Sequence, residues 1–173
     1  CKVLYNNFWR IALIDRVQEY TMLVTNWMKK AVFSIYQGQS LGQAAELLVQ
    51  HHIGTLPVID LSGRLVGVIT LADVLRVGMP DFIQLVDDFK FVHDFGAMER
   101  FIPDGSVLNH SVDEKMHEPI SVDEKATILH AAAVMQQSNL RDLPVTDSEG
   151  KLIGIVSHVD IGVALIRNWN FIG

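Results

Sequence analysis

The alternation of apolar and polar residues predicts a regular run of short elements in the first half of the chain. In order, the pattern predicts a strand at 32–35, a helix at 41–52, strands at 56–59 and 65–69, and a helix at 70–77. Ser40 precedes the first helix as an N-cap, and Gly63 marks the turn between the two later strands. Because proline cannot donate to a sheet ladder, we expect Pro57 at the start of its strand or at a sheet edge.

The second half repeats this order. The pattern predicts a strand at 120–122, a helix at 128–137, strands at 143–145 and 152–156, and a helix at 157–166. Similar segments lie 87 positions apart without a gap: 54–60 matches 141–147, and 63–73 matches 150–160. This period exceeds the roughly 20–50 residues of solenoid repeats, so it indicates a duplicated small domain of β-α-β-β-α order. Each copy is small for independent stability, and we expect the two to share a core.

Two segments lie outside the repeats. Residues 1–24 carry apolar side chains at helical spacing and predict a helix that either packs on its own domain, which we favour, or serves dimerisation or docking. Residues 81–111 are too apolar for a flexible linker and predict a helical insertion. That insertion either contacts a partner or covers the sheet edges.

Composition narrows the class of protein. Of 173 residues, 49% are apolar, which is ample for a core. The formal charge of −6 argues against general binding to nucleic acid or anionic membranes. No apolar run approaches the roughly 20 residues that span a bilayer, and the N-terminal pattern is not the one expected of a signal peptide. The single cysteine, Cys1, excludes an internal disulfide, and we expect a cytoplasmic location.

The repeated motif resembles a known family. Each half contains a Leu-Pro-Val strand, a glycine turn and the pattern Gly-x-x-[Thr/Ser]-x-x-Asp, at 67–73 and 154–160. This combination resembles a tandem pair of CBS (cystathionine β-synthase) domains, the Bateman module. The resemblance implies a mixed α+β fold with two repeats, at 25–80 and 112–169, packed about a pseudo-twofold axis. The N-terminal helix and the helical insertion would be additions to it.

The resemblance also implies a function. Adenosine-containing ligands such as AMP, ADP, ATP or S-adenosylmethionine would bind in the clefts between the repeats and regulate a partner or a linked domain. No catalysis and no required cofactor are implied. A ligand-independent dimerisation module is the alternative. A homodimer is expected under either hypothesis, and an enzyme is the least favoured.

The chemistry of the motif can be argued from the residues themselves. Thr70 and Ser157 fall at predicted strand-to-helix junctions, and Asp73 and Asp160 follow one turn later, so hydroxyl and carboxylate share a face. A carboxylate can accept hydrogen bonds from both ribose hydroxyls of a nucleoside. The same spacing is also that of a helix capping box, and both roles are compatible. The missing Cβ of Gly67 and Gly154 would permit close approach of a ligand or of another backbone.

Further contacts follow from the resemblance alone. It implies base and phosphate contacts from Gly54 and Thr55 in the first repeat, and from Arg141 and Asp142 in the second. Phe33 and Ile120 would flank the base. Only Arg141 is cationic among these positions, so phosphate binding is expected at the second cleft rather than the first. Three further candidates for contact with the ligand are Lys30, Lys115 and His158.

Other chemistry is weakly represented. The seven histidines show no His-x-x-x-His pair, and no metal site is predicted. We find no nucleophile elbow, no P-loop and no dinucleotide-binding glycine pattern. The sequence therefore favours a binding module over an enzyme.

Overall fold

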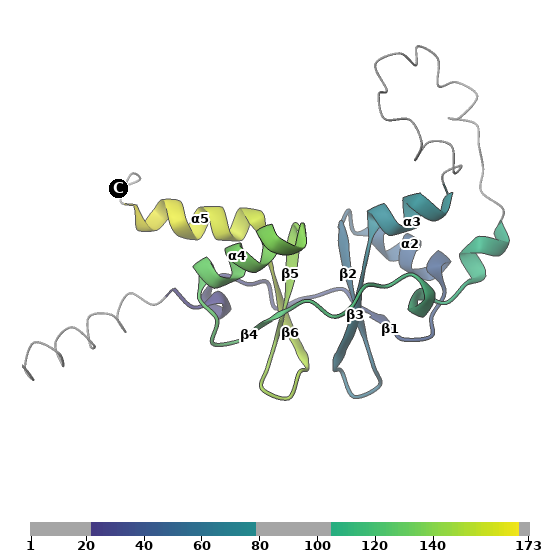
Figure 1. Ribbon diagram of the computed structural model, residues 1–173, viewed down its shortest axis with the longest axis horizontal. Coiled ribbons are helices and arrows are strands. Elements are labelled where there is room, and N and C mark those ends of the chain that lie inside the picture. Colours follow the sequence, from purple (N-terminus) through teal and green to yellow (C-terminus); the bar gives the residue numbers. More distant parts are fainter. Residues whose placement is uncertain (1–21, 79–104, 170–173) are drawn as a thin grey trace, which may run out of the picture.

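The computed structural model describes residues 22–78 and 105–169, and the predicted β-α-β-β-α order is confirmed in both repeats (Figure 1). The first repeat consists of β1 (Ile35–Tyr36), α2 (Leu41–Gln50), β2 (Thr55–Ile59), β3 (Leu65–Thr70) and α3 (Leu71–Gly78). The second consists of β4 (Val122–Asp123), α4 (Ile128–Ser138), β5 (Asp142–Thr146), β6 (Leu152–Ser157) and α5 (His158–Asn168). Short 3-10 helices are η1 (Val24–Asn26), η4 (Gly105–Asn109) and η5 (Val112–Glu114). The helix predicted at 1–24 and the insertion predicted at 81–111 lie largely outside the described residues.

Some boundaries differ from the predicted ones. The first strand of each repeat begins later than predicted, at Ile35 and Val122, because it pairs only with the last two residues of the neighbouring strand. Each closing helix begins one residue later than predicted. The reason is that Thr70 ends β3 and Ser157 ends β6, where Ser157 has extended backbone (φ −99°, ψ 165°) and serves as the N-cap of α5.

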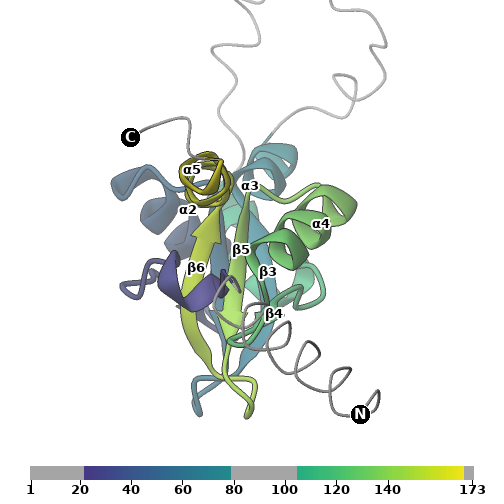
Figure 2. The same ribbon diagram turned by 90° about the vertical axis from the view of Figure 1, so that its left-hand side faces the viewer.

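Each repeat is a three-stranded sheet with two helices on its outward side. The strand order is β1-β2-β3 and β4-β5-β6, with the first pair parallel and the second antiparallel. Leu56 and Val58 of β2 point into the core beneath the helices, whereas Thr55 and Pro57 are buried outside that core. Figures 1 and 2 show the two sheets side by side in the centre with the helices outside. Both faces of each sheet are therefore covered.

The position predicted for Pro57 is wrong. Pro57 lies in the middle of β2, the central strand, opposite Val68. Val68 exchanges both of its backbone hydrogen bonds with His117 (3.1 and 2.8 Å), so it has none left for Pro57. The proline nitrogen consequently faces the other side, where β1 pairs only from Val58 onward, and no ladder bond is lost. Pro144 repeats this arrangement opposite Ile155.

The two hairpin turns join the repeats to one another. Leu65 N–H donates to the carbonyl of Gly150 and Leu152 N–H to the carbonyl of Gly63, both at 3.0 Å. Both glycines have positive φ, 83° and 78°, a conformation that glycine adopts without strain. The reciprocal pair of hydrogen bonds relates the repeats by a pseudo-twofold axis, as the family resemblance implies.

Each repeat is completed by the leading segment of the other one, which is the stretch before β1 or before β4. Val24 is fully buried in the core of the second repeat, and Val112 is fully buried in the core of the first. Backbone bonds hold both segments, from Val24 N–H to Ala126 O and from Val112 N–H to Gln39 O, each 2.8 Å long. The repeats therefore depend on each other's leading segment, which explains why neither half of the sequence looks self-sufficient.

Two methionines of these segments occupy the space beside the motif glycines. A Cβ placed on Gly67 would overlap the sulfur of Met116 and would lie only 3.0 Å from the carbonyl oxygen of His117. A Cβ on Gly154 would overlap the sulfur of Met28. A methionine side chain thus approaches both glycines, which neither expectation named. At Gly67 a backbone carbonyl also approaches, as the second expectation states.

We predict that Gly67→Ala destabilises the fold by about 1–3 kcal/mol, because the added methyl overpacks a contact that includes backbone. The matched control is Gly162→Ala in α5, where a Cβ meets nothing within 4 Å and the alanine favours the helix. Urea unfolding of both variants measures the difference. Equal stability of the two variants would contradict this account of Gly67.

Candidate functional site

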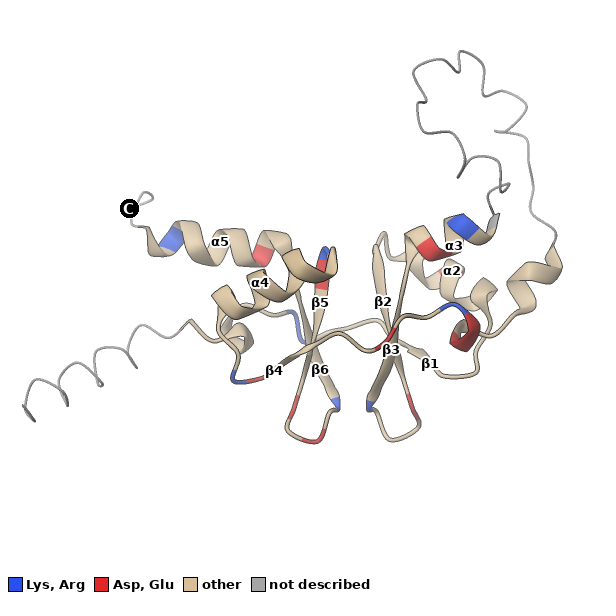
Figure 3. Ribbon diagram, viewed as in Figure 1, with Lys and Arg blue, Asp and Glu red and all other residues tan. Residues whose placement is uncertain are grey.

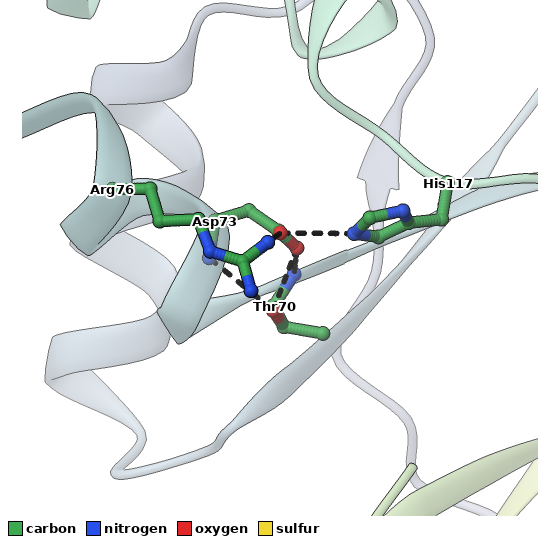
Figure 4. Close-up of polar contacts among 4 residues, drawn as sticks. All are labelled: Thr70, Asp73, Arg76 and His117. Carbon is green, nitrogen blue, oxygen red and sulfur yellow. Dashed lines mark hydrogen bonds and ion pairs between the residues drawn. The ribbon is translucent and has the colours of Figure 1, made fainter. Parts of the chain in front are cut away.

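The strand-to-helix junction of the first repeat forms the predicted hydroxyl–carboxylate pair (Figure 4). The side chain of Asp73 accepts hydrogen bonds at Oδ2 from the backbone N–H and the hydroxyl of Thr70, at 2.8 and 2.6 Å. The Thr70 hydroxyl in turn accepts from the N–H of Asp73, at 3.3 Å. The pair thus caps α3, as the capping alternative requires, and this use of Oδ2 leaves the second oxygen of Asp73 for other partners.

The second repeat forms the same arrangement. Asp160 accepts at Oδ2 from the N–H and the hydroxyl of Ser157, at 2.9 and 2.6 Å, and the N–H of Asp160 donates back to the hydroxyl at 3.2 Å. Together these bonds form a capping box at the start of α5. The spacing in the sequence was therefore sufficient to predict both pairs.

The remaining carboxylate oxygen, Oδ1, has different surroundings in the two aspartates. In the first repeat, Oδ1 of Asp73 lies 2.9 Å from Nε2 of His117 and 3.6 Å from a guanidinium nitrogen of Arg76 (Figure 4). In the second repeat, Lys29 approaches Asp160 at 4.0 Å, and it does so at Oδ2. The two junctions therefore share a scaffold but differ in their surroundings.

His117 is a site residue that the sequence analysis missed. It lies 44 positions from Asp73, in the leading segment of the second repeat, yet it borders the first repeat in space. Its counterpart is Lys29, because the two follow Met116 and Met28 respectively and pair with Val68 and Ile155. The available signal was the repeated Val-x-x-x-Met pattern at 24–28 and 112–116.

The residues just before the Leu-Pro pair of each repeat, at the start of β2 and of β5, come together at the centre of the molecule. A Cβ on Gly54 would lie 4.0 Å from a carboxylate oxygen of Asp142 in the other repeat. The carbonyls of Gly54 and Arg141 accept backbone bonds from Leu71 (3.0 Å) and His158 (2.9 Å). Thr55 is buried, so its side chain is less accessible than those of its neighbours.

One pocket lies beside the start of β5 in the second repeat. It has a volume of about 610 Å³ and is open to solvent. Its lining residues come from α4, the following loop and the first turn of α5: Ala132, Met135, Gln136, Asn139, Leu140, Arg141, His158 and Ile161. Of the predicted contact residues, Arg141 and the further candidate His158 line it.

The two residues expected to flank a base have different environments. Phe33 is half exposed and stacks on the ring of His51, with centroids 3.6 Å apart and planes 13° apart. Ile120 is half-buried and packs against the core of the second repeat. Neither observation decides whether these two residues flank a base, which stays a prediction.

Comparison with known proteins decides the family. The sequence pattern of the CBS domain matches residues 24–79 and 112–166, well over half of the chain. The chain belongs to the CBS domain family. A CBS domain-containing protein of Dictyostelium discoideum is 30% identical over 149 residues, covering 84% of this chain and 92% of its own length.

Solved structures show the same fold. The tandem CBS pair is similar to CBSX2 of Arabidopsis thaliana in complex with AMP, with 26% identity and a TM-score of 0.61 over 86% of this chain and 99% of CBSX2. It is also similar in fold to the CBS domain pair of protein MJ0100 in complex with 5′-methylthioadenosine and S-adenosyl-L-methionine. That match has 23% identity and a TM-score of 0.62 over 86% and 98% of the two chains.

Charged residues of the CBS pair are dispersed. Figure 3 shows the lysine and arginine positions scattered over several elements rather than gathered on one. Among the residues that the structure describes, no three His, Cys, Asp or Glu side chains are close enough together to hold a metal ion. In the same part of the chain, no helix is long and apolar enough to cross a membrane.

The electrostatics of Asp73 reflect its partners. Burial acts to raise the pKa of this carboxyl, but the hydrogen bonds from Thr70 and His117 together outweigh it and hold the pKa below the ordinary 3.8. Because the pKa is lower in the folded than in the unfolded chain, the contribution of Asp73 to stability is fully present above about pH 4. That contribution is lost as the pH falls through the folded pKa.

We predict that Thr70→Val raises the pKa of Asp73, because it removes a hydrogen bond to the carboxylate while the burial remains. Carbon-detected NMR titration of the Asp73 carboxyl measures the change. Thr127→Val is the control, since Thr127 caps α4 and does not contact Asp73. An unchanged pKa in Thr70→Val would contradict the stated balance of causes.

Proposed function

We propose that this CBS pair is a regulatory module that binds an adenosine-containing ligand between its repeats and thereby controls a partner or a linked domain. The observation that carries the proposal is the duplicated hydroxyl–carboxylate pair at the two strand-to-helix junctions. The AMP complex of CBSX2 and the adenosyl complexes of the MJ0100 pair support the ligand class. The ligand itself, AMP, ADP, ATP or S-adenosylmethionine, is to be decided by measurement.

Asp160 is the residue proposed to hold the ribose. Its Oδ2 is occupied by Ser157, whereas Oδ1 accepts no hydrogen bond from the residues that the structure describes. The Asp160 side chain retains 20% of its surface accessible to solvent. An available carboxylate oxygen on a fixed helix turn suits the vicinal hydroxyls of a ribose.

Arg141 and His158 are proposed to contact the phosphate. Both line the pocket of about 610 Å³, and His158 lies two residues before Asp160 on the first turn of α5. The N-terminal end of α5 adds a favourable field for an anion. The first repeat has Gly54 and Leu71 at the corresponding positions, which supports the expectation that phosphate prefers the second site.

We predict that AMP stabilises the chain, by about 2.7 kcal/mol when its concentration is 100 times the dissociation constant. Thermal shift and calorimetric titration with AMP, ADP, ATP, S-adenosylmethionine and adenosine measure the effect. Asp160→Asn is expected to weaken every ligand, because all share the ribose. Arg141→Gln is expected to weaken AMP more than adenosine. Absence of stabilisation by all five compounds would reject the ligand-sensing function.

A separate observation supports a role in dimerisation. Val159, Val163 and Ile166 form an exposed apolar stripe on α5 with helical spacing, and Leu71 and Leu75 are exposed on the related helix α3. Both helices lie on the same side of the molecule (Figure 1). A second copy of this chain fits this surface, because a twofold axis would bring apolar helices against their own equivalents.

We predict that the chain is a dimer and that Val163→Glu shifts it towards monomer, because the stripe would bury an unpaired charge. Sedimentation equilibrium at several concentrations measures this. Ala133→Glu on the exposed face of α4 is the matched control and is expected to leave the dimer intact. A wild-type monomer, or a dimer insensitive to Val163→Glu, would place the interface elsewhere or remove it.

A further inference from the structure

The two ligand sites of the pair are not equivalent. An aspartate that is to accept ribose hydroxyls needs a carboxylate oxygen without a partner. Asp160 has one, as described above. Asp73 has none, because Thr70 occupies Oδ2 while His117 and Arg76 occupy Oδ1. Asp73 is also the more buried of the two, at 7% exposed against 20% for Asp160.

The ring of His117 is directed at Asp73 by its own backbone. His117 exchanges two hydrogen bonds with Val68 of β3, which fixes where its side chain starts. The side chain is 54% exposed, so the ring lies at the surface of the site rather than in the core. It takes up Oδ1 of Asp73, the oxygen that a ribose hydroxyl would need, and so replaces the hydrogen bond that such a hydroxyl would make (Figure 4).

The counterpart in the second repeat leaves its aspartate open. Lys29 is 65% exposed, and its nitrogen reaches Asp160 only at 4.0 Å, at the oxygen that Ser157 already occupies. Arg76, which lies three residues after Asp73, corresponds to the uncharged Val163. Neither residue blocks Oδ1 of Asp160.

A second histidine, His51, stacks on Phe33 in the first repeat. Phe33 is the residue expected to flank a base. The residues at the equivalent positions of the second repeat are Ile120 and Ser138, which present no ring to compete with a base. In the first repeat, base and ribose would thus each meet a histidine of the chain.

We propose that His117 acts as a built-in substitute for the ligand at Asp73, so that the wild-type chain binds one adenosine ligand, at Asp160, and not two. This inference rests on the proposed function. A hydrogen bond to a charged group has a free energy that corresponds to roughly ten- to a hundredfold in affinity, so a ligand at Asp73 is expected to bind weaker than at Asp160 by that factor or more.

Calorimetric titration of the full chain with AMP tests the inference. We expect one site per chain in the wild type, a loss of at least tenfold in affinity for Asp160→Asn, and no change for Asp73→Asn. His117→Ala is expected to add a second site, and His117→Ala combined with Asp73→Asn is expected to remove it again. His110→Ala is the matched control, because His110 pairs with Glu114 in the same segment and does not contact Asp73.

Three results would overturn the inference: two equal sites in the wild type, one site that depends on Asp73, or one site in a folded His117→Ala. If His117→Ala does not fold, an NMR titration of the wild-type chain with AMP, followed at the ring signals of His117, is used instead. These signals are expected to be unchanged at saturating AMP, and a shift that persists in Asp160→Asn would contradict the inference. Absence of AMP binding in every variant would instead reject the proposed function, so the two failures are distinguishable.

Discussion

The exchange of leading segments is the constraint on which the rest of the structure depends. The buried side chains of Val24 and Val112 fill the cores of the opposite repeats, and their backbones are hydrogen-bonded there. The exchange places Met28 and Met116 against the motif glycines and sets Lys29 and His117 beside the outer strands β6 and β3. The surroundings of each aspartate thus include a residue from outside the repeat to which that aspartate belongs.

The sequence was sufficient for features that depend on residues close together in the chain. Apolar periodicity predicted the order of the elements, and the Thr/Ser-x-x-Asp spacing predicted the bonds within each junction, because residues one helical turn apart share a face. The sequence was not sufficient where the position of a residue depends on which strand pairs with it. The late start of β1 and the central place of Pro57 both follow from which backbone groups lie opposite, and propensity contains no information about that.

The candidate site shows the same division. Asp73 and Asp160 are predictable from a motif, whereas the contact between Asp73 and His117 joins positions 44 apart through the segment exchange. Of the positions expected from family resemblance, Gly54 lies close to Asp142, whereas Phe33 stacks on His51 and Ile120 packs against the core of the second repeat. Where the repeats differ in sequence, at Arg76 and Val163 or at Lys29 and His117, equal backbones have different side-chain chemistry.

The segment exchange also has an evolutionary consequence. Each leading segment fills the core of the other repeat, and two identical copies of one repeat could make the same exchange with strict twofold symmetry. The present chain therefore has the architecture of a segment-swapped homodimer joined in one polypeptide. Two copies within one polypeptide need not be identical, unlike the two subunits of a homodimer. A change such as lysine in one copy and histidine in the other became possible at a single junction without being imposed on both.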